Sequence, residues 1–120
     1  MEWEEARAEI HNNIKVGVDL NTTRSTYRFV RTVPPPYFRV QIGANKKRDI
    51  VNIPWSMLEE CWRELNETDR YDCKVFEKYY PKKKNNHGCY VHTVGKIFEK
   101  AILVDSVDDK YYVLKQAHRD

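Results

Sequence analysis

Cysteine and histidine residues near position 90 are of the types that bind zinc. His87, Cys89 and His92 fall within six residues of one another, and Cys73 precedes them. Tetrahedral zinc accepts mixed sulfur and nitrogen ligands. The set lacks the paired-cysteine spacing C-x2-C, however, and Cys73 is distant from the other three in sequence. Buried thiols beside solvated histidines are therefore the favoured interpretation, and we predict no metal or cofactor.

The same region contains a pair that suits nucleophilic catalysis. Cys89 and His92 are three residues apart, so a helix places them on one side, as a thiol and its general base require. No third group that would orient the histidine is evident. Phosphate-binding loops of the forms G-x-x-x-x-G-K-[ST] and G-x-G-x-x-G are absent from the sequence. We predict a protein without enzymatic activity.

Basic residues are concentrated in two blocks of the chain. Residues 20–48 hold seven arginines and lysines and no acid, and residues 74–100 hold seven bases against two acids. Acidic segments alternate with these blocks, and the net charge is +3. Basic blocks that converge on one side would attract an anionic polymer. Basic blocks that fold against the acidic segments would be neutralised instead, and the sequence leaves both alternatives open.

Length and composition indicate one globular domain. The chain has 120 residues, of which 41% are hydrophobic and 32% charged, and this size suits a single core. No apolar run approaches the roughly 20 residues that cross a bilayer. The first ten residues are acidic, unlike a signal or transit peptide, and three cysteines are too few for a disulfide scaffold. We predict one cytoplasmic domain over residues 1–120 with no membrane association.

The first half of this domain, residues 1–53, is predicted to hold a helix and a basic sheet. Residues 2–11 have apolar residues at helical spacing. Residues 25–32, 37–43 and 49–54 alternate with period two, which predicts three antiparallel strands. Phe29 and Phe38 are assigned to the core face, and Arg28, Tyr37 and Arg39 to the polar face. Lys46, Lys47 and Arg48 fall in the loop before the third strand.

The second half, residues 54–114, is predicted to hold three helices and a hairpin. The first helix covers 56–65, the second covers 72–81 with Asp72 as its N-cap, and the third covers 89–101. Short apolar runs on either side of Asp108 and Asp109 predict a closing hairpin. Gly95 costs about 1 kcal/mol relative to alanine inside a helix. We interpret it as the site of a close helix crossing, in preference to the close approach of a ligand.

Residues 50–114 resemble a winged-helix domain in the order of their elements. The segments "IPWSMLEECWREL" and "DCKVFEKYY" match its first two helices, "CYVHTVGKIFEKAI" its recognition helix, and "LVDSVDDKYYVL" its wing. The resemblance implies that outward residues of the third helix enter the major groove of DNA. The wing tip departs from the pattern, because Asp108 and Asp109 would repel phosphate.

These observations predict a non-enzymatic α+β protein that binds nucleic acid, DNA in preference to RNA, through phosphate contacts. The predicted contact residues are Arg28, Arg39, Lys46, Lys47, Arg48, Lys82, Lys83, Lys84, Tyr90, His92, Thr93, Lys96 and Lys100. The alternative is a small protein-interaction module that binds an acidic protein partner. Such a module would act as a regulator or inhibitor, of the kind that phages and mobile elements encode. The sequence indicates no oligomeric state.

Overall fold

Alternating residues build an antiparallel sheet from β1 (Arg28–Thr32), β2 (Phe38–Ile42) and β3 (Asp49–Ile53), in that order, in a computed structural model of the chain. The structure describes residues 1–24, 26–43, 49–82 and 87–119. Val40 lies opposite both Val30 and Val51, so three buried valines share one face. Residues 17–20 cover the edge of β1: the amide of Leu20 donates to the carbonyl of Arg28 at 2.8 Å.

Four α-helices and a second small sheet complete the mixed α+β fold. The helices are α1 (Trp3–Asn13), α2 (Trp55–Thr68), α3 (Cys73–Tyr79) and α4 (His87–Lys100). Asp72 caps α3 as predicted, because its side chain accepts from the amides of Lys74 and Val75 at 3.0 and 3.2 Å. Within the described ranges, the longest helices have 14 residues and fall short of the length and apolar content of a membrane span.

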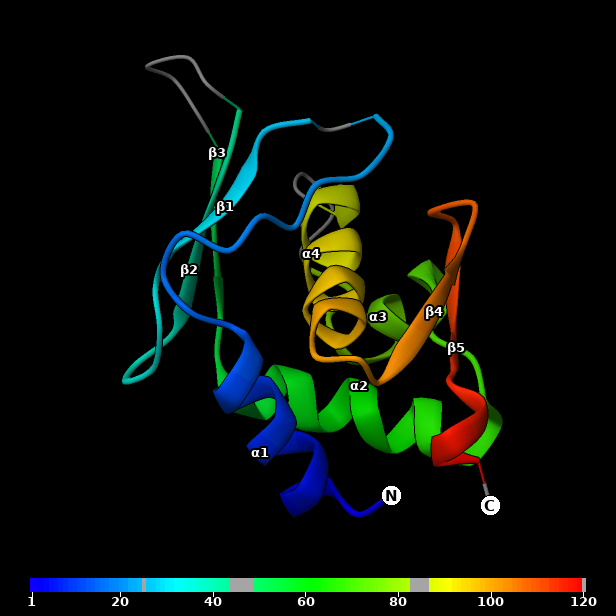
Figure 1. Ribbon diagram of the computed structural model, residues 1–120. Helices are drawn as coiled ribbons and strands as arrows, with labels where there is room; N and C mark the ends of the chain where they lie inside the picture. The colour runs from blue at the N-terminus through cyan, green and yellow to red at the C-terminus, as the bar shows by residue number, and fades with distance from the viewer. Residues whose placement is uncertain (25, 44–48, 83–86, 120) are drawn as a thin grey trace.

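Helix α4 lies at the centre of the fold, between the three-stranded sheet and the hairpin, as Figure 1 shows. It contacts α1, α3, β3 and β4. Val91, Val94 and Phe98 are fully or almost fully buried. The ring of Phe98 meets the ring of Trp62 from α2 edge to face, with centroids 5.8 Å apart. A helix in this position is covered on more than one side, and this decides how much of α4 a ligand can reach.

The hairpin consists of β4 (Val104–Val107) and β5 (Tyr111–Leu114), followed by a 3-10 turn over Gln116–His118. Asp108 and Asp109 both have a φ of 53°, and the amide of Lys110 donates to the carbonyl of Val107 at 2.9 Å. Two successive left-handed residues form the type of turn that matches the twist of a tight hairpin. The predicted order of helices, strands and hairpin is therefore confirmed.

The assignment of β1 side chains to the two faces of the sheet was wrong. Arg28 is only 3% exposed and lies on the same side of the strand as the buried Val30. Phe29 is half-buried on the opposite side, where its ring packs against Tyr27 with centroids 4.8 Å apart. The prediction took the aromatic Phe29 as the residue that faces the core, whereas Val30 is the one that does. Phe38 on β2 is buried as predicted.

Candidate nucleic-acid interface

Two of the residues predicted to extend outward from α4 are buried. Thr93 is 0% exposed and Lys96 is 6% exposed, so the expectation that they face solvent is wrong. The Lys96 ammonium donates to Asp109 Oδ1 at 2.7 Å and to Glu99 Oε1 at 2.9 Å. The hairpin turn that carries Asp109 covers this side of the helix. Lys96 therefore neutralises carboxylates of its own chain.

Asp109 is the centre of a hydrogen-bonded cluster that joins three parts of the fold. Its carboxylate accepts from the Lys96 ammonium, from Ser106 Oγ at 2.9 Å and from the amide of Thr23 at 2.9 Å. Burial raises the pKa of Asp109, but these donors outweigh burial and hold the pKa well below its ordinary value. Burial lowers the pKa of Lys96, and its two carboxylate partners more than reverse that effect. The cluster attaches the residue 19–24 segment and the hairpin to α4.

His92 faces the hairpin. Its Nδ1 lies 3.3 Å from the hydroxyl of Tyr112, and the side chain is half-buried. Burial lowers the pKa of His92, and the nearby Arg28 guanidinium lowers it further. A histidine whose charged form is disfavoured in this way is a poor partner for phosphate at neutral pH.

Gly95 marks a close approach by the aromatic ring of Tyr112. A Cβ atom at position 95 would overlap this ring, and Tyr112 comes from β5. The predicted helix crossing was therefore wrong, because the hairpin and not a helix lies against the glycine. Hydrogen in place of a side chain lets the hairpin pack directly on the backbone of α4.

The remaining predicted contacts are distributed over separate parts of the protein. Tyr90 is buried and stacks on Phe76, with ring centroids 5.8 Å apart. The Lys100 ammonium lies 3.5 Å from an Asp19 carboxylate oxygen. Lys82 is exposed after Pro81. Lys46, Lys47, Arg48, Lys83 and Lys84 lie outside the described residues.

The side of the three-stranded sheet that faces away from the helices forms a continuous surface, which we call the outer sheet face. Figure 1 shows the four helices and the hairpin all on the other side. Strand alternation and register place eight side chains on this face: Phe29, Arg31, Thr32, Tyr37, Arg39, Gln41, Ile50 and Asn52. Two are arginines, two are aromatic and none is acidic. Gln41 is buried, at 4% exposed. The acidic Asp19 is bridged to Phe29 at the edge of β1, and its carboxylate lies 3.5 Å from the Lys100 ammonium.

The arginines of the outer sheet face are accessible. Arg31 and Arg39 are exposed, and neither forms an ion pair with a carboxylate in the described part of the chain. Arg31 Nε donates to Gln41 Oε1 at 2.6 Å, which orients its guanidinium over β2. Tyr37 and Ile50 are exposed hydrophobic residues on the same face. The face therefore combines fixed positive charge with flat apolar surface.

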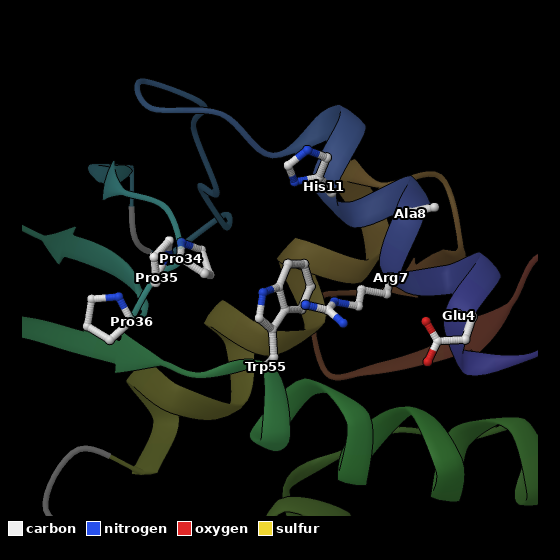
Figure 2. A pocket seen from close by; sticks show the side chains of 8 residues that line it. All are labelled: Glu4, Arg7, Ala8, His11, Pro34, Pro35, Pro36 and Trp55. Atoms are coloured by element: carbon white, nitrogen blue, oxygen red, sulfur yellow. The ribbon is translucent and has the colours of Figure 1, made fainter.

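A concave surface lies beside the turn that joins β1 to β2. This groove has a volume of about 560 Å³ and is lined by Glu4, Arg7, Ala8, His11, Pro34, Pro35, Pro36 and Trp55. We call it the proline groove. Figure 2 shows the prolines on one side, the α1 side chains on the other, and the Trp55 indole between them. The Arg7 guanidinium lies 4.9 Å from the centroid of the indole ring.

Zinc ligands do not converge among the residues whose side chains the structure describes. No group of three His, Cys, Asp or Glu side chains in that part of the protein is placed to hold a metal ion. Cys73 is exposed on α3, and His92 faces Tyr112. The side chains of His87 and Cys89 lie outside the description.

Arg31 and the groove residues were not predicted as contacts. Side chains alternate along a strand, so Arg31 and Phe29 share one face and Val30 lies on the other. Assigning the apolar Val30 to the core would have placed both Arg31 and Phe29 on the outer face. Nothing local in the sequence joins α1, the three prolines and Trp55, because these segments meet only through tertiary packing. Comparisons with protein-family models, with curated proteins and with solved structures find no match to this chain.

Proposed function

We propose that this protein is a non-enzymatic nucleic-acid-binding protein that holds a single strand on its outer sheet face. The observation that supports this proposal is the combination of two exposed arginines with aromatic side chains on one face of the sheet. Aromatic rings stack on bases whatever their sequence, and arginines follow the phosphates. The described side chains of the outer sheet face carry no negative charge, and the Asp19 carboxylate at its edge lies beside the Lys100 ammonium.

The strand positions suit an extended ligand. Arg31 and Arg39 lie on neighbouring strands, and Arg39 is paired in register with Thr32 and Asn52. Tyr37 precedes the buried Phe38 and follows the proline turn, so it lies on the same side as Arg39 at one end of the sheet. Phe29 and Tyr27 offer a second aromatic site further along β1. Bases that stack at both sites would place their phosphates near the arginines.

We do not propose that α4 binds a nucleic-acid duplex. Thr93 and Lys96 are buried, and the Lys96 charge is neutralised by Asp109 and Glu99. An exposed recognition helix needs side chains that can reach base edges. Among the predicted α4 contacts, Lys100 is exposed but has Asp19 within 3.5 Å.

We propose that α2, α3, α4 and the hairpin form a winged-helix-like arrangement that supports the sheet and does not itself bind the ligand. The element order supports it, and a bridge between Tyr71 and Tyr112 ties the α2–α3 connection to the hairpin. In this arrangement the hairpin stabilises α4 through Tyr112 and Asp109. Its acidic turn is the wrong charge for a contact with phosphate.

A protein partner with an acidic surface is the second candidate for the same face. Ile50 favours it, since this exposed aliphatic side chain has neither a ring to stack on a base nor a group to bind phosphate. Tyr37, Ile50 and the two arginines would then form a mixed apolar and basic docking surface.

Fluorescence anisotropy with labelled single strands and a matched duplex, between about 50 and 300 mM salt, tests the proposal. We expect the wild-type protein to bind single strands more tightly than the duplex. Arg31→Ala combined with Arg39→Ala should weaken binding and reduce the salt slope by about 0.7 for each lost phosphate contact.

The control variant is Lys74→Ala combined with Lys110→Ala, which removes two exposed charges from α3 and the hairpin turn. It should leave affinity and salt slope close to wild type. Equal losses in the two double variants would mean that net charge, and not the outer sheet face, governs binding. Absence of binding to every probe at low salt would refute the proposal and favour the protein partner.

A further inference from the structure

Polar side chains of α1 line one side of the proline groove. Glu4, Arg7, Ala8 and His11 occur at positions i, i+3, i+4 and i+7 of α1 and form an exposed stripe along one side of the helix. Neither an ion pair nor a side-chain hydrogen bond links Glu4, Arg7 or His11 to another described residue. In the described part of the chain, the Arg7 guanidinium packs over the Trp55 ring, 4.9 Å from its centroid.

Trp55 presents a hydrogen-bond donor to this groove. Phe38 and Trp3 meet the indole edge to face at 5.0 and 6.1 Å, so the ring is held firmly in place. Figure 2 shows the nitrogen of the indole turned towards the three prolines. In the described part of the chain, no acceptor receives the Nε1 hydrogen of Trp55. A ligand placed between the prolines and the indole would therefore meet flat apolar rings and one fixed donor.

From this arrangement we infer that the proline groove binds one nucleotide of the single strand that crosses the outer sheet face. Its base lies between the proline rings and the edge of Trp55, where Nε1–H donates to a ring carbonyl. Its phosphate lies against the α1 stripe, where Arg7 and His11 supply donors. This inference rests on the proposed function, because it extends the same bound strand by one site.

Charge and connectivity favour a nucleotide as the occupant. Arg7 and His11 suit an anion at one end of the groove, and Glu4 can accept from the ring N–H of thymine or uracil. Tyr37 directly follows Pro36, so the groove and the outer sheet face meet at the proline turn. A strand leaving the sheet past Tyr37 would arrive at the groove.

The inference predicts a base preference that the outer sheet face alone would not produce. Uracil, thymine, guanine and cytosine have a carbonyl oxygen that projects beyond the ring to accept the Trp55 hydrogen, whereas adenine has no carbonyl and can accept only at ring nitrogens, which lie within the ring edge. Oligothymidine should therefore bind more tightly than oligoadenosine. Trp55→Phe keeps an aromatic ring but removes the donor, so it should weaken oligothymidine more than oligoadenosine and reduce that preference by about threefold or more.

The experiment measures oligothymidine and oligoadenosine affinities for wild type, Trp55→Phe, and Arg7→Gln combined with His11→Gln. The Arg7 and His11 variant should weaken both ligands by about tenfold, whereas the exposed control Lys74→Gln should weaken neither. Photocrosslinking of an oligonucleotide containing 5-iodouracil, followed by mass spectrometry, provides a second measurement if Trp55→Phe is poorly folded. Crosslinks on the peptides containing His11 or Trp55 are expected.

The outcomes separate this inference from the proposed function. Binding with an unchanged thymine-to-adenine ratio in Trp55→Phe, and crosslinks confined to Phe29 or Tyr37, would overturn the groove and leave the outer sheet face intact. Crosslinks at the groove with no effect of the Arg31 and Arg39 variant would support the groove and overturn the sheet as the main site. Absence of binding to any oligonucleotide would overturn both.

Discussion

Replacing Lys96 by methionine separates the charge of this side chain from its packing. The side chains of Lys96 and Asp109 are 7% and 16% exposed, so their ion pair is largely shielded from water. Removing one partner of a buried pair costs about 3–5 kcal/mol because the other charge is left without compensation. Asp109 would keep the Thr23 amide and Ser106 hydroxyl as donors. We therefore expect Lys96→Met to lower the free energy of unfolding by about 2–3 kcal/mol at pH 7.

The same variant should also change the response of the protein to acid. The pKa of Asp109 in the folded state lies below the unfolded value of about 3.9, so its contribution to stability is complete above that pH. That contribution is lost as the pH falls through 3.9 towards the lower folded pKa. Without Lys96, the folded pKa of Asp109 rises back towards its ordinary value. The stability difference between wild type and Lys96→Met should therefore shrink between about pH 5 and pH 2.

Urea unfolding followed by tryptophan fluorescence measures these differences, with an unchanged m value as the sign of an intact native state. Lys100→Met is the matched control on the same helix. Its ammonium lies 3.5 Å from Asp19 and both side chains are well exposed, so the effect should stay within about 0.5 kcal/mol. A Lys96→Met protein as stable as wild type, with the same loss of stability in acid, would refute the reasoning.

Two further predictions concern α4 and its end. Gly95→Ala should destabilise the protein by about 2–3 kcal/mol, because the new methyl group overlaps the Tyr112 ring and the hairpin must shift. Thermal unfolding measures this loss of stability, and a neutral effect would mean that the hairpin moves freely. Ile102→Gly should stabilise the protein by about 0.5–1 kcal/mol. Ile102 is 57% exposed and has a φ of 64°, a left-handed conformation that costs a β-branched residue about 1–2 kcal/mol, and glycine relieves this strain at some cost in backbone entropy. A lower urea midpoint for Ile102→Gly would contradict this account.

Local patterns were sufficient to predict the elements of the fold. The helical spacing of Leu58, Cys61, Trp62 and Leu65 predicts α2, and all four side chains are buried. Period-two alternation predicts β1 to β3, and Asp72 predicts the start of α3. These features depend on residues close together in sequence, because backbone hydrogen bonding and side-chain period act over short distances.

The exposure of polar residues on those elements was predicted less well. Thr93 and Lys96 were assigned to solvent because the opposite side of α4 is apolar. A central helix has a second packed side, and Lys96 can be buried only because Asp109 arrives from another element to neutralise it. The proline groove has the same origin, since its residues come from α1, the β1–β2 turn and the start of α2.

By itself, the sequence determined an α+β chain with a basic first sheet, a series of three helices and a closing hairpin. Only the tertiary structure decided which of its charges are available to a partner. Hydrophobic residues recur with the period of a helix or strand and so mark its buried side, whereas the position of a charged residue in the sequence does not show whether it is exposed. Arg28 and Lys96 are buried, whereas Arg31 and Arg39 are exposed, although all four belong to the predicted basic blocks. The difference arises from what packs over each element, and that depends on residues distant in the sequence.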